Sequence, residues 1–478
     1  MRTTFPFSQR LFLFVAGLFL IAATPASSQE ARSDSTIAGA WSAEEAYFRP
    51  VIRLERSANG SLVGFLADRA DQMGAPFSKT RLRGDSLFLQ SDQMGARFHG
   101  AVSLEEQVIQ GTWTQGDRSA TLTLTPIEKG GAGEAASTTS SRPQHPDKTY
   151  PYRTEEVKFK SDAGGVELAG TLSRPDEDGP HPAVVLLHGT GRNDRDYEHR
   201  GLKFFHVLAD HLTRRGFAVL RYDMRGAGES GGHLHAADLE DLARDAASAL
   251  SFLKEQPGVD ATKVGLIGHS MGGMIAPWVH NQFEEVAFLA LLAPPSVTGY
   301  EVLVGQNARL ADATGASAVE VDSIHDQSRR VFDILRSDRD SADVAEQLRT
   351  ILGEKEGGDD RLQLKVEANT HPWFRDLTRY DPRPALRQVN VPILVFFGGQ
   401  DLGVLPRQNA GPMRAALVES PSDTISVRTV EGLNHFLRPV EAARSSDDAV
   451  SETTIAPEVL AQLSDWVREV TQHEASSE

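Results

Sequence analysis

Cysteine is absent from the 478 residues of this sequence. The absence excludes disulfide bonds, thiolate metal ligands, a thiol nucleophile and a lipid-modified cysteine at a cleavage point. Any covalent chemistry must therefore come from serine, threonine, lysine, aspartate or glutamate side chains. The 41 glycines, 24 prolines and 40% hydrophobic residues are typical of a globular protein. The length predicts two or three domains, since domains of about 100–200 residues are usual.

Positive charge is also scarce. There are 49 lysine and arginine residues against 66 aspartate and glutamate residues, which gives a formal net charge of −17 at pH 7. This sign is wrong for binding a phosphate backbone through a cationic face, so we exclude nucleic acid as a partner. The same acidic excess is expected to repel anionic substrates and anionic membrane surfaces.

An uncharged hydrophobic run lies close to the N-terminus. Arg2 and Arg10 precede a run without charge from Leu11 to Ala23, and small residues follow at 24–29. This order predicts a secretory signal peptide, residues 1–28, cleaved after Ala26 or Ser28. The run is shorter than the ~20 apolar residues that span a bilayer, so cleavage is favoured over retention as an anchor. We expect an exported protein, periplasmic or secreted, with no membrane anchor after cleavage.

Residues 37–127 alternate short apolar runs with turn signals such as Asn59-Gly60 and Gly84-Asp85. Turns every 8–12 residues predict a small antiparallel β domain, a sandwich or a barrel, with a binding or packing role. Residues 128–150 lose this pattern and are rich in Gly, Ala, Ser and Thr, which predicts a flexible linker.

Beyond residue 150 the pattern changes to continuous apolar runs separated by segments of helical spacing. This alternation predicts an α/β domain, residues 151–478, with a mostly parallel central sheet and helices on both faces. The interval 296–380 is charged and helical in character, and it separates two strands that a single short crossover could join. We interpret it as an inserted helical cap over the ligand-binding edge of the sheet; the alternative is a helical elaboration with no role in binding.

The sharpest motif is Gly268-His269-Ser270-Met271-Gly272-Gly273, which lies between an apolar strand and a helical segment. This context predicts a nucleophile elbow, with Ser270 as nucleophile and the Met271 N–H as an oxyanion donor. A second match to the same pattern, residues 228–232, lies inside a loop that no helix follows. We therefore assign its Ser230 a structural role.

A serine nucleophile needs a base, and the base needs an orienting acid. Asp401 follows the apolar strand 393–397 and His435 follows the strand 425–430, so both leave the sheet edge from which Ser270 emerges. The alternatives are a turn-forming aspartate and a surface-loop histidine. The loop His188-Gly189-Thr190-Gly191 follows another strand, and its Thr190 N–H is the predicted second oxyanion donor, with His188 bracing the loop.

These motifs, in the order Ser, Asp, His, resemble the α/β-hydrolase superfamily. The likeness covers residues 153–474 and includes the loop 188–196, the stretch 221–230, the elbow and Tyr380-Asp381-Pro382. Within that superfamily, the chain is similar to the exported serine esterase, prolyl-oligopeptidase-like and serine-aminopeptidase-like branch, in which a small β domain often precedes the hydrolase. Asp223 and Arg225 are expected to form an ion pair that fixes loop geometry.

The resemblance implies acyl transfer through an acyl-enzyme, with a small-molecule ester as substrate. It implies no metal and no cofactor, and the sequence contains no HExxH pattern. We favour a carboxylesterase. The alternatives are a serine peptidase or amidase with the same triad, and a non-catalytic binding protein with a vestigial hydrolase domain.

Overall fold

The structure is a computed structural model of the full chain, and its described residues fall into two compact units, each treated by itself. One unit contains the described residues up to 127 together with Leu352–Ala368, and the other contains those from 144 to 351 and from 369 onward. The residues that the structure describes are 37–43, 51–56, 62–67, 75–91, 96–103, 105, 107–115, 118–127, 144–146, 149–199, 202–313, 316–353, 359–440 and 453–472. The predicted signal peptide and most of the predicted linker lie outside them.

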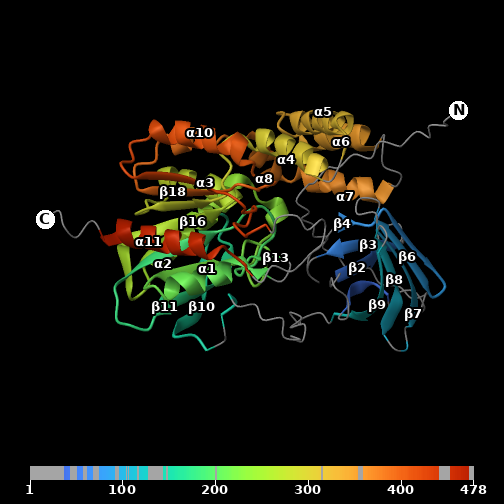
Figure 1. The fold of residues 1–478 in the computed structure, drawn as a ribbon, viewed down its shortest axis with the longest axis horizontal. Coiled ribbons are helices and arrows are strands. Elements are labelled where there is room, and N and C mark those ends of the chain that lie inside the picture. The colour runs from blue at the N-terminus through green and yellow to red at the C-terminus, as the bar shows by residue number, and fades with distance from the viewer. Residues whose placement is uncertain are drawn as a thin grey trace. The chain divides into compact units, whose positions relative to one another are not determined.

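The first unit contains an antiparallel sheet in the order β4-β3-β2-β1-β9-β8-β7-β6-β5 (Figure 1). Only two residues separate β4 from β5, so the two end strands of the sheet belong to one segment and the sheet curls closed on itself. The strands are β1 (Gly39–Ala43), β2 (Val51–Arg56), β3 (Leu62–Ala67), β4 (Ala75–Pro76), β5 (Lys79–Arg83), β6 (Ser86–Ser91), β7 (Ala96–Ser103), β8 (Val108–Gln115) and β9 (Arg118–Pro126).

Alternating burial along the strands builds the core of this unit. In β7 the residues from Ala96 to Ala101 alternate strictly between buried and exposed, which places Phe98 inside. Phe98, Trp113 and Leu89 are fully buried there. This unit is consistent with the small antiparallel β domain expected from the sequence.

The second unit is built on a sheet in the order β10-β11-β15-β12-β16-β17-β18-β19. β10, β11 and β15 pair antiparallel, and from β15 to β19 every neighbouring pair is parallel. The strands are β10 (Tyr152–Lys160), β11 (Glu167–Pro175), β12 (His181–Leu187), β15 (Ala218–Tyr222), β16 (Val259–His269), β17 (Leu289–Leu292), β18 (Ile393–Gly398) and β19 (Ile425–Val430). β13 (Glu198–His199) pairs with β14 (Leu202–Lys203) outside this sheet.

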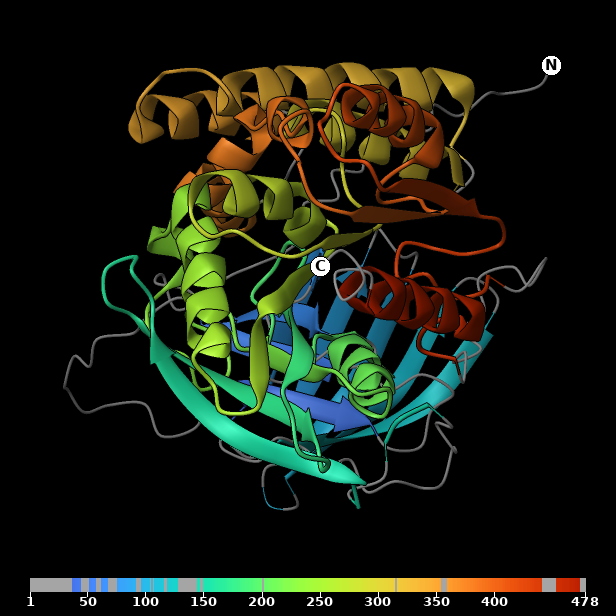
Figure 2. The same ribbon diagram turned by 90° about the vertical axis from the view of Figure 1, so that its left-hand side faces the viewer.

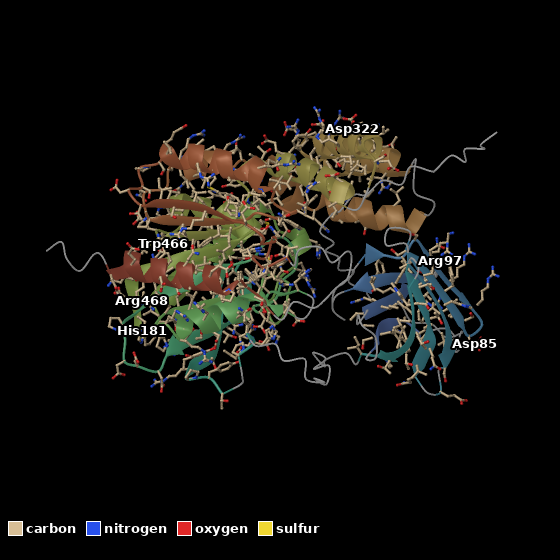
Figure 3. The ribbon with its side chains drawn as sticks, in the orientation of Figure 1. Asp85, Arg97, His181, Asp322, Trp466 and Arg468 are labelled. Carbon is tan, nitrogen blue, oxygen red and sulfur yellow. The ribbon has the colours of Figure 1, made fainter. Side chains whose placement is uncertain are left out.

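Helices cover both faces of the sheet, so the inner strands β12, β15, β17 and β18 are buried on both sides, as their continuous apolar runs predict. One core layer joins α2 (Leu239–Lys254), α3 (Met271–Gln282) and α10 (Pro406–Val418) to the sheet. The other layer holds α1 (Phe204–Thr213) and α11 (Pro457–Gln472), which lie side by side in Figure 2. On α11, Trp466 turns inward and meets Phe288 edge-on, while Arg468 turns outward (Figure 3).

Between β17 and β18 the chain forms a run of helices, α4 (Gly299–Ala313), α5 (Ala318–Leu335), α6 (Ser341–Gly353), α7 (Asp359–Thr370), α8 (Pro372–Arg379) and α9 (Arg383–Leu386). Ser317 and Glu320 form a capping box that starts α5. At its other end, the buried Arg375 of α8 donates hydrogen bonds to the carbonyl oxygens of Leu335 and Ser337. This capping joins α8 to α5.

Candidate active site

Ser270 lies at the turn between β16 and α3, with its backbone in a strained conformation (φ 54°, ψ −120°) that non-glycine residues rarely adopt. The turn is tight enough to exclude side chains at two neighbouring positions. A Cβ atom on Gly268 would lie 2.4 Å from the Gly272 oxygen, and one on Gly272 would lie 2.3 Å from the Leu187 oxygen. The glycines of the motif are therefore a steric requirement of the elbow.

The structure brings the three side chains singled out from the sequence into one line of hydrogen bonds. His435 Nε2 lies 3.1 Å from Ser270 Oγ, and His435 Nδ1 lies 2.8 Å from Asp401 Oδ2. Each residue follows the carboxyl end of a different parallel strand, β16, β18 or β19, so the topology gathers them at one edge of the sheet. The His435 side chain is 25% exposed, which leaves it open to a reacting molecule, while the Asp401 side chain is fully buried.

The buried Asp401 carboxylate is held by the turn that follows it. Its Oδ1 accepts hydrogen bonds from the backbone N–H groups of Gly403 at 2.7 Å and Val404 at 2.8 Å. Its Oδ2 is left for His435. These three donors satisfy a charge that would otherwise be costly to bury, and they fix which oxygen faces the imidazole.

The two predicted oxyanion donors flank Ser270. Met271 is the first residue of α3, so its N–H has no partner within the helix. In the described part of the chain, neither this N–H nor that of Thr190 donates a hydrogen bond. The Thr190 loop lies against the nucleophile, because a Cβ atom on Gly189 would be 3.0 Å from the Ser270 Cβ.

Asn193 sets the direction of the Thr190 N–H. Its Nδ2 donates to the Gly189 carbonyl oxygen at 3.2 Å and to the Thr190 carbonyl oxygen at 3.3 Å. In a trans peptide the C=O and N–H point in opposite directions, so drawing the Gly189 carbonyl toward Asn193 turns the Thr190 N–H away from it. The sequence showed Asn193 only as part of a loop, without this role.

His188 braces the same loop. Its Nε2 lies 2.9 Å from the Asp194 carbonyl oxygen, and burial lowers the pKa of its imidazole to about 4. Because a carbonyl oxygen only accepts, Nε2 carries the proton of the neutral ring. This bond crosses the loop that contains Thr190, as the bracing role requires.

Ser230, in the second copy of the pattern, has its hydroxyl occupied. It donates to the Asp223 carbonyl oxygen at 2.7 Å and accepts from the Ala169 N–H at 2.9 Å. The residue is 9% exposed and is followed by a loop. These contacts agree with the structural role predicted for it.

The prediction of an ion pair between Asp223 and Arg225 was wrong. Asp223 instead binds Arg195, with Nη2 to Oδ2 at 2.7 Å, while Arg225 forms a two-bond pair with the Asp245 carboxylate, each bond 2.7 Å long. Asp223 follows β15 and accepts the Arg195 backbone N–H as well, whereas Arg225 packs against α2, which carries Asp245. Two residues close in sequence thus brace two different elements.

Sequence reasoning missed two buried residues beside the line of hydrogen bonds: one bonds to the His435 backbone and the other bonds to the first. His269 was treated only as part of the elbow, and Tyr197 was not singled out. His269 Nε2 lies 2.9 Å from the His435 carbonyl oxygen, and its Nδ1 lies 3.1 Å from the Tyr197 hydroxyl. The motif itself contained a signal for His269, because a buried histidine beside a nucleophile needs hydrogen-bond partners for both ring nitrogens.

Among the described residues, no three His, Asp or Glu side chains gather in a way that could hold a metal ion. No helix in that part of the chain combines the length and the apolar character needed to cross a bilayer.

Part of the chain is similar to known proteins. Residues 178–343, from the strand before the Thr190 loop into the helical insertion, match the family described as "Serine aminopeptidase, S33". Esterase EstD from Thermotoga maritima is 26% identical over 300 residues, which are 63% of this chain and 65% of the esterase. These matches support an α/β-hydrolase superfamily, esterase-like protein.

Other relatives of this α/β-hydrolase align over shorter segments or share less sequence. A thiohydrolase from Aspergillus aculeatus is 32% identical over 133 residues, covering 27% of this chain and 37% of the relative. The chain thus spans less than two thirds of either curated relative. Among solved structures, an esterase from Pyrococcus furiosus has a TM-score of 0.42 at 15% identity, covering 67% of this chain and 91% of that one. An esterase from Thermogutta terrifontis has a TM-score of 0.40 at 20% identity, covering 66% and 100%.

Proposed function

We propose that this α/β-hydrolase is a serine hydrolase that cleaves carboxylic esters through an acyl-enzyme intermediate. The observation that carries the proposal is the line from Ser270 through His435 to Asp401, with separations of 3.1 and 2.8 Å, beginning at a strained elbow. A serine hydroxyl at neutral pH is a poor nucleophile, and a histidine at hydrogen-bonding distance is the group that activates it. The name of the Thermotoga maritima relative favours esters as the substrate class.

In the acylation half, His435 Nε2 takes the Ser270 hydroxyl proton as Oγ bonds to the ester carbonyl carbon. The carbonyl electrons move onto its oxygen, which the N–H groups of Met271 and Thr190 stabilise. The carbonyl then re-forms, the bond to the alcohol breaks, and His435 gives its proton to the departing alkoxide. Asp401 accepts the Nδ1–H throughout and so favours the imidazolium that forms between the two proton transfers.

In the deacylation half, a water molecule takes the place of the alcohol. His435 removes a proton from the water as its oxygen attacks the acyl carbon, and the same two N–H groups stabilise the second oxyanion. Collapse of this intermediate breaks the bond to Ser270 Oγ, which recovers a proton from His435, and the carboxylic acid leaves. The enzyme returns to its starting protonation state.

A peptidase or amidase with the same residues is the second candidate, because the matching family is described as a serine aminopeptidase. An aminopeptidase must bind the substrate's amino group, usually with a free carboxylate. The buried carboxylates next to the Thr190 loop are already paired: Asp223 binds Arg195 and Asp245 binds Arg225. This pairing removes them as amine ligands and supports the ester.

The decisive test is turnover of p-nitrophenyl butyrate by the wild type and by Ser270→Ala. We expect the variant to lose hydrolysis and labelling by a fluorophosphonate. Ser230→Ala is the matched control, since it changes the serine of the second motif, and it should keep both. Undiminished turnover by Ser270→Ala would refute the nucleophile assignment, and faster cleavage of aminoacyl p-nitroanilides than of esters would favour the peptidase.

Two further parts of the proposal concern export and the range of substrates. We propose export through the signal peptide at residues 1–28, tested by N-terminal sequencing of the protein recovered outside the cytoplasm. We also propose that the helical insertion from 296 to 380 limits which acyl chains reach Ser270. Removal of α5 and α6, Ala318–Gly353, should then broaden the range of p-nitrophenyl ester chain lengths that are hydrolysed.

A further inference from the structure

His269, the residue before the nucleophile, is completely buried and links the elbow to the loop that carries the general base. Its Nε2 lies 2.9 Å from the backbone carbonyl oxygen of His435. A carbonyl oxygen can only accept a hydrogen bond, so the proton of the His269 ring is on Nε2. Phe436, the next residue of that loop, stacks on the His269 ring with centroids 5.0 Å apart, which holds the ring plane.

The other ring nitrogen of His269 must then accept. Burial lowers the pKa of His269 well below its ordinary value, so the ring is neutral and Nδ1 has a free lone pair. The Tyr197 hydroxyl lies 3.1 Å from this nitrogen. Burial also raises the pKa of Tyr197, so the phenol keeps its proton and donates it to Nδ1.

Gly189 lies directly against the Tyr197 phenol oxygen. The approach is close: a Cβ atom on Gly189 would lie 2.3 Å from that oxygen. The Tyr197 backbone is itself in the left-handed region (φ 49°), and its N–H donates to the Asp194 carbonyl oxygen at 3.0 Å. Tyr197 therefore has a fixed place beneath the Thr190 loop.

The bonds run in one direction, from the Tyr197 hydroxyl to His269 Nδ1 and from His269 Nε2 to the His435 carbonyl, and Gly189 packs against the Tyr197 end. We infer that Tyr197 and His269 are positioning residues whose contacts hold the Thr190 loop and the His435 loop in register with Ser270. This inference rests on the proposed function, since it names residues that orient the same site. Neither side chain touches the reacting atoms.

Three substitutions separate positioning from packing. Tyr197→Phe keeps the ring and removes the hydroxyl bond to His269. His269→Leu fills the space without polar atoms, whereas His269→Gln offers an N–H to the His435 carbonyl and an oxygen to the Tyr197 hydroxyl. Tyr150→Phe is the matched control, because it removes another tyrosine–histidine hydrogen bond of this unit, 3.1 Å long, to His206.

Kinetics with p-nitrophenyl butyrate give the first readout, with active sites counted by fluorophosphonate titration. We expect kcat of Tyr197→Phe and His269→Leu to fall about 10- to 100-fold, as displacement of catalytic groups does, with KM changed less than about threefold. His269→Gln should recover most of the loss, and Tyr150→Phe should match the wild type. A loss explained wholly by a smaller active fraction, or equal loss in the Gln and Leu variants, would overturn the inference.

The second readout does not depend on turnover. In wild type labelled with ¹⁵N-histidine, the His269 resonances, identified by their absence in His269→Gln, should show a protonated Nε2 and a bare Nδ1. Tyr197→Phe should shift the Nδ1 resonance, while Tyr150→Phe should not. Protonation on Nδ1 would overturn the inference. If the wild type hydrolysed no ester or amide but gave this signature, the proposed function would fail while the hydrogen-bond chain stood.

Discussion

Replacement of Asp401 by asparagine is predicted to abolish most activity through the tautomer of His435. In the wild type, Oδ1 accepts two backbone N–H groups, at 2.7 and 2.8 Å, and Oδ2 faces His435 Nδ1 at 2.8 Å. The asparagine oxygen must therefore take the Oδ1 place, since an NH₂ group there would meet two donors. Its NH₂ group then faces His435 Nδ1 and forces the ring proton onto Nε2.

With the proton on Nε2, His435 donates toward Ser270 Oγ and cannot remove its proton. In serine proteases the same change lowers kcat by about 10⁴, which corresponds to about 5.5 kcal/mol of activation free energy. We expect a loss of similar size here. Because the asparagine oxygen keeps the two backbone bonds, the melting temperature of Asp401→Asn should stay close to that of the wild type, while Asp401→Ala, which leaves both N–H groups without that acceptor, should melt lower.

The assay is pre-steady-state release of p-nitrophenol from p-nitrophenyl butyrate, from pH 6 to pH 10. In Asp401→Asn the rate should be low near neutrality and should rise with hydroxide concentration, which can substitute for the lost base. A variant that stays folded and keeps kcat within tenfold of the wild type at pH 7 would refute the account of the tautomer.

Three other predictions follow from the same region. Gly272→Ala places a Cβ 2.3 Å from the Leu187 oxygen and should lower the free energy of unfolding by more than about 3 kcal/mol. Gly411→Ala in α10, where a Cβ meets open space, should raise the free energy of unfolding by about 0.5–1 kcal/mol. Urea unfolding measures both changes. Asn193→Ala releases the Gly189–Thr190 peptide and should lower kcat at least about tenfold with little change in KM; an unchanged kcat would contradict the role of Asn193 in aiming the oxyanion donor. Burial lowers the pKa of His188 to about 4 in the folded protein, so below pH 6.5 its imidazole binds a proton more readily in the unfolded chain. The free energy of unfolding should therefore fall as the pH falls from 6.5 toward 4. Wild type should lose about 2–3 kcal/mol more than His188→Gln between pH 7 and pH 4.5, and equal losses would contradict this assignment.

The residues found from the sequence share one property: each follows the carboxyl end of a parallel strand of the main sheet by a few residues. Ser270, Asp401 and His435 could be placed at one edge of the sheet because the carboxyl ends of parallel strands meet there. The glycines of the elbow added a local signature, since only small residues fit a turn that tight. Chain order and strand ends were therefore enough to predict which side chains meet.

Partners that depend on side-chain direction could not be predicted in this way. Asp223 and Arg225 are two residues apart, but one faces Arg195 and the other faces α2. Tyr197 is separated from His269 by 72 positions and follows no strand of the main sheet, so nothing local marks it. The closure of the β domain depends on the short break between β4 and β5, and alternating burial alone does not distinguish a closed sheet from a sandwich.

The oxyanion donors show why the two kinds of information are needed together. A backbone N–H is present at every residue except proline, so its identity carries no signal; its usefulness depends on where the peptide points. At Met271 the helix start sets that direction, and the elbow motif is enough to predict it. At Thr190 the direction depends on Asn193, a side chain three residues further along the chain. The first donor is therefore a property of the motif, whereas the second depends on a contact that only the folded loop makes, and for that reason Asn193→Ala is the substitution that tests the loop without changing the elbow.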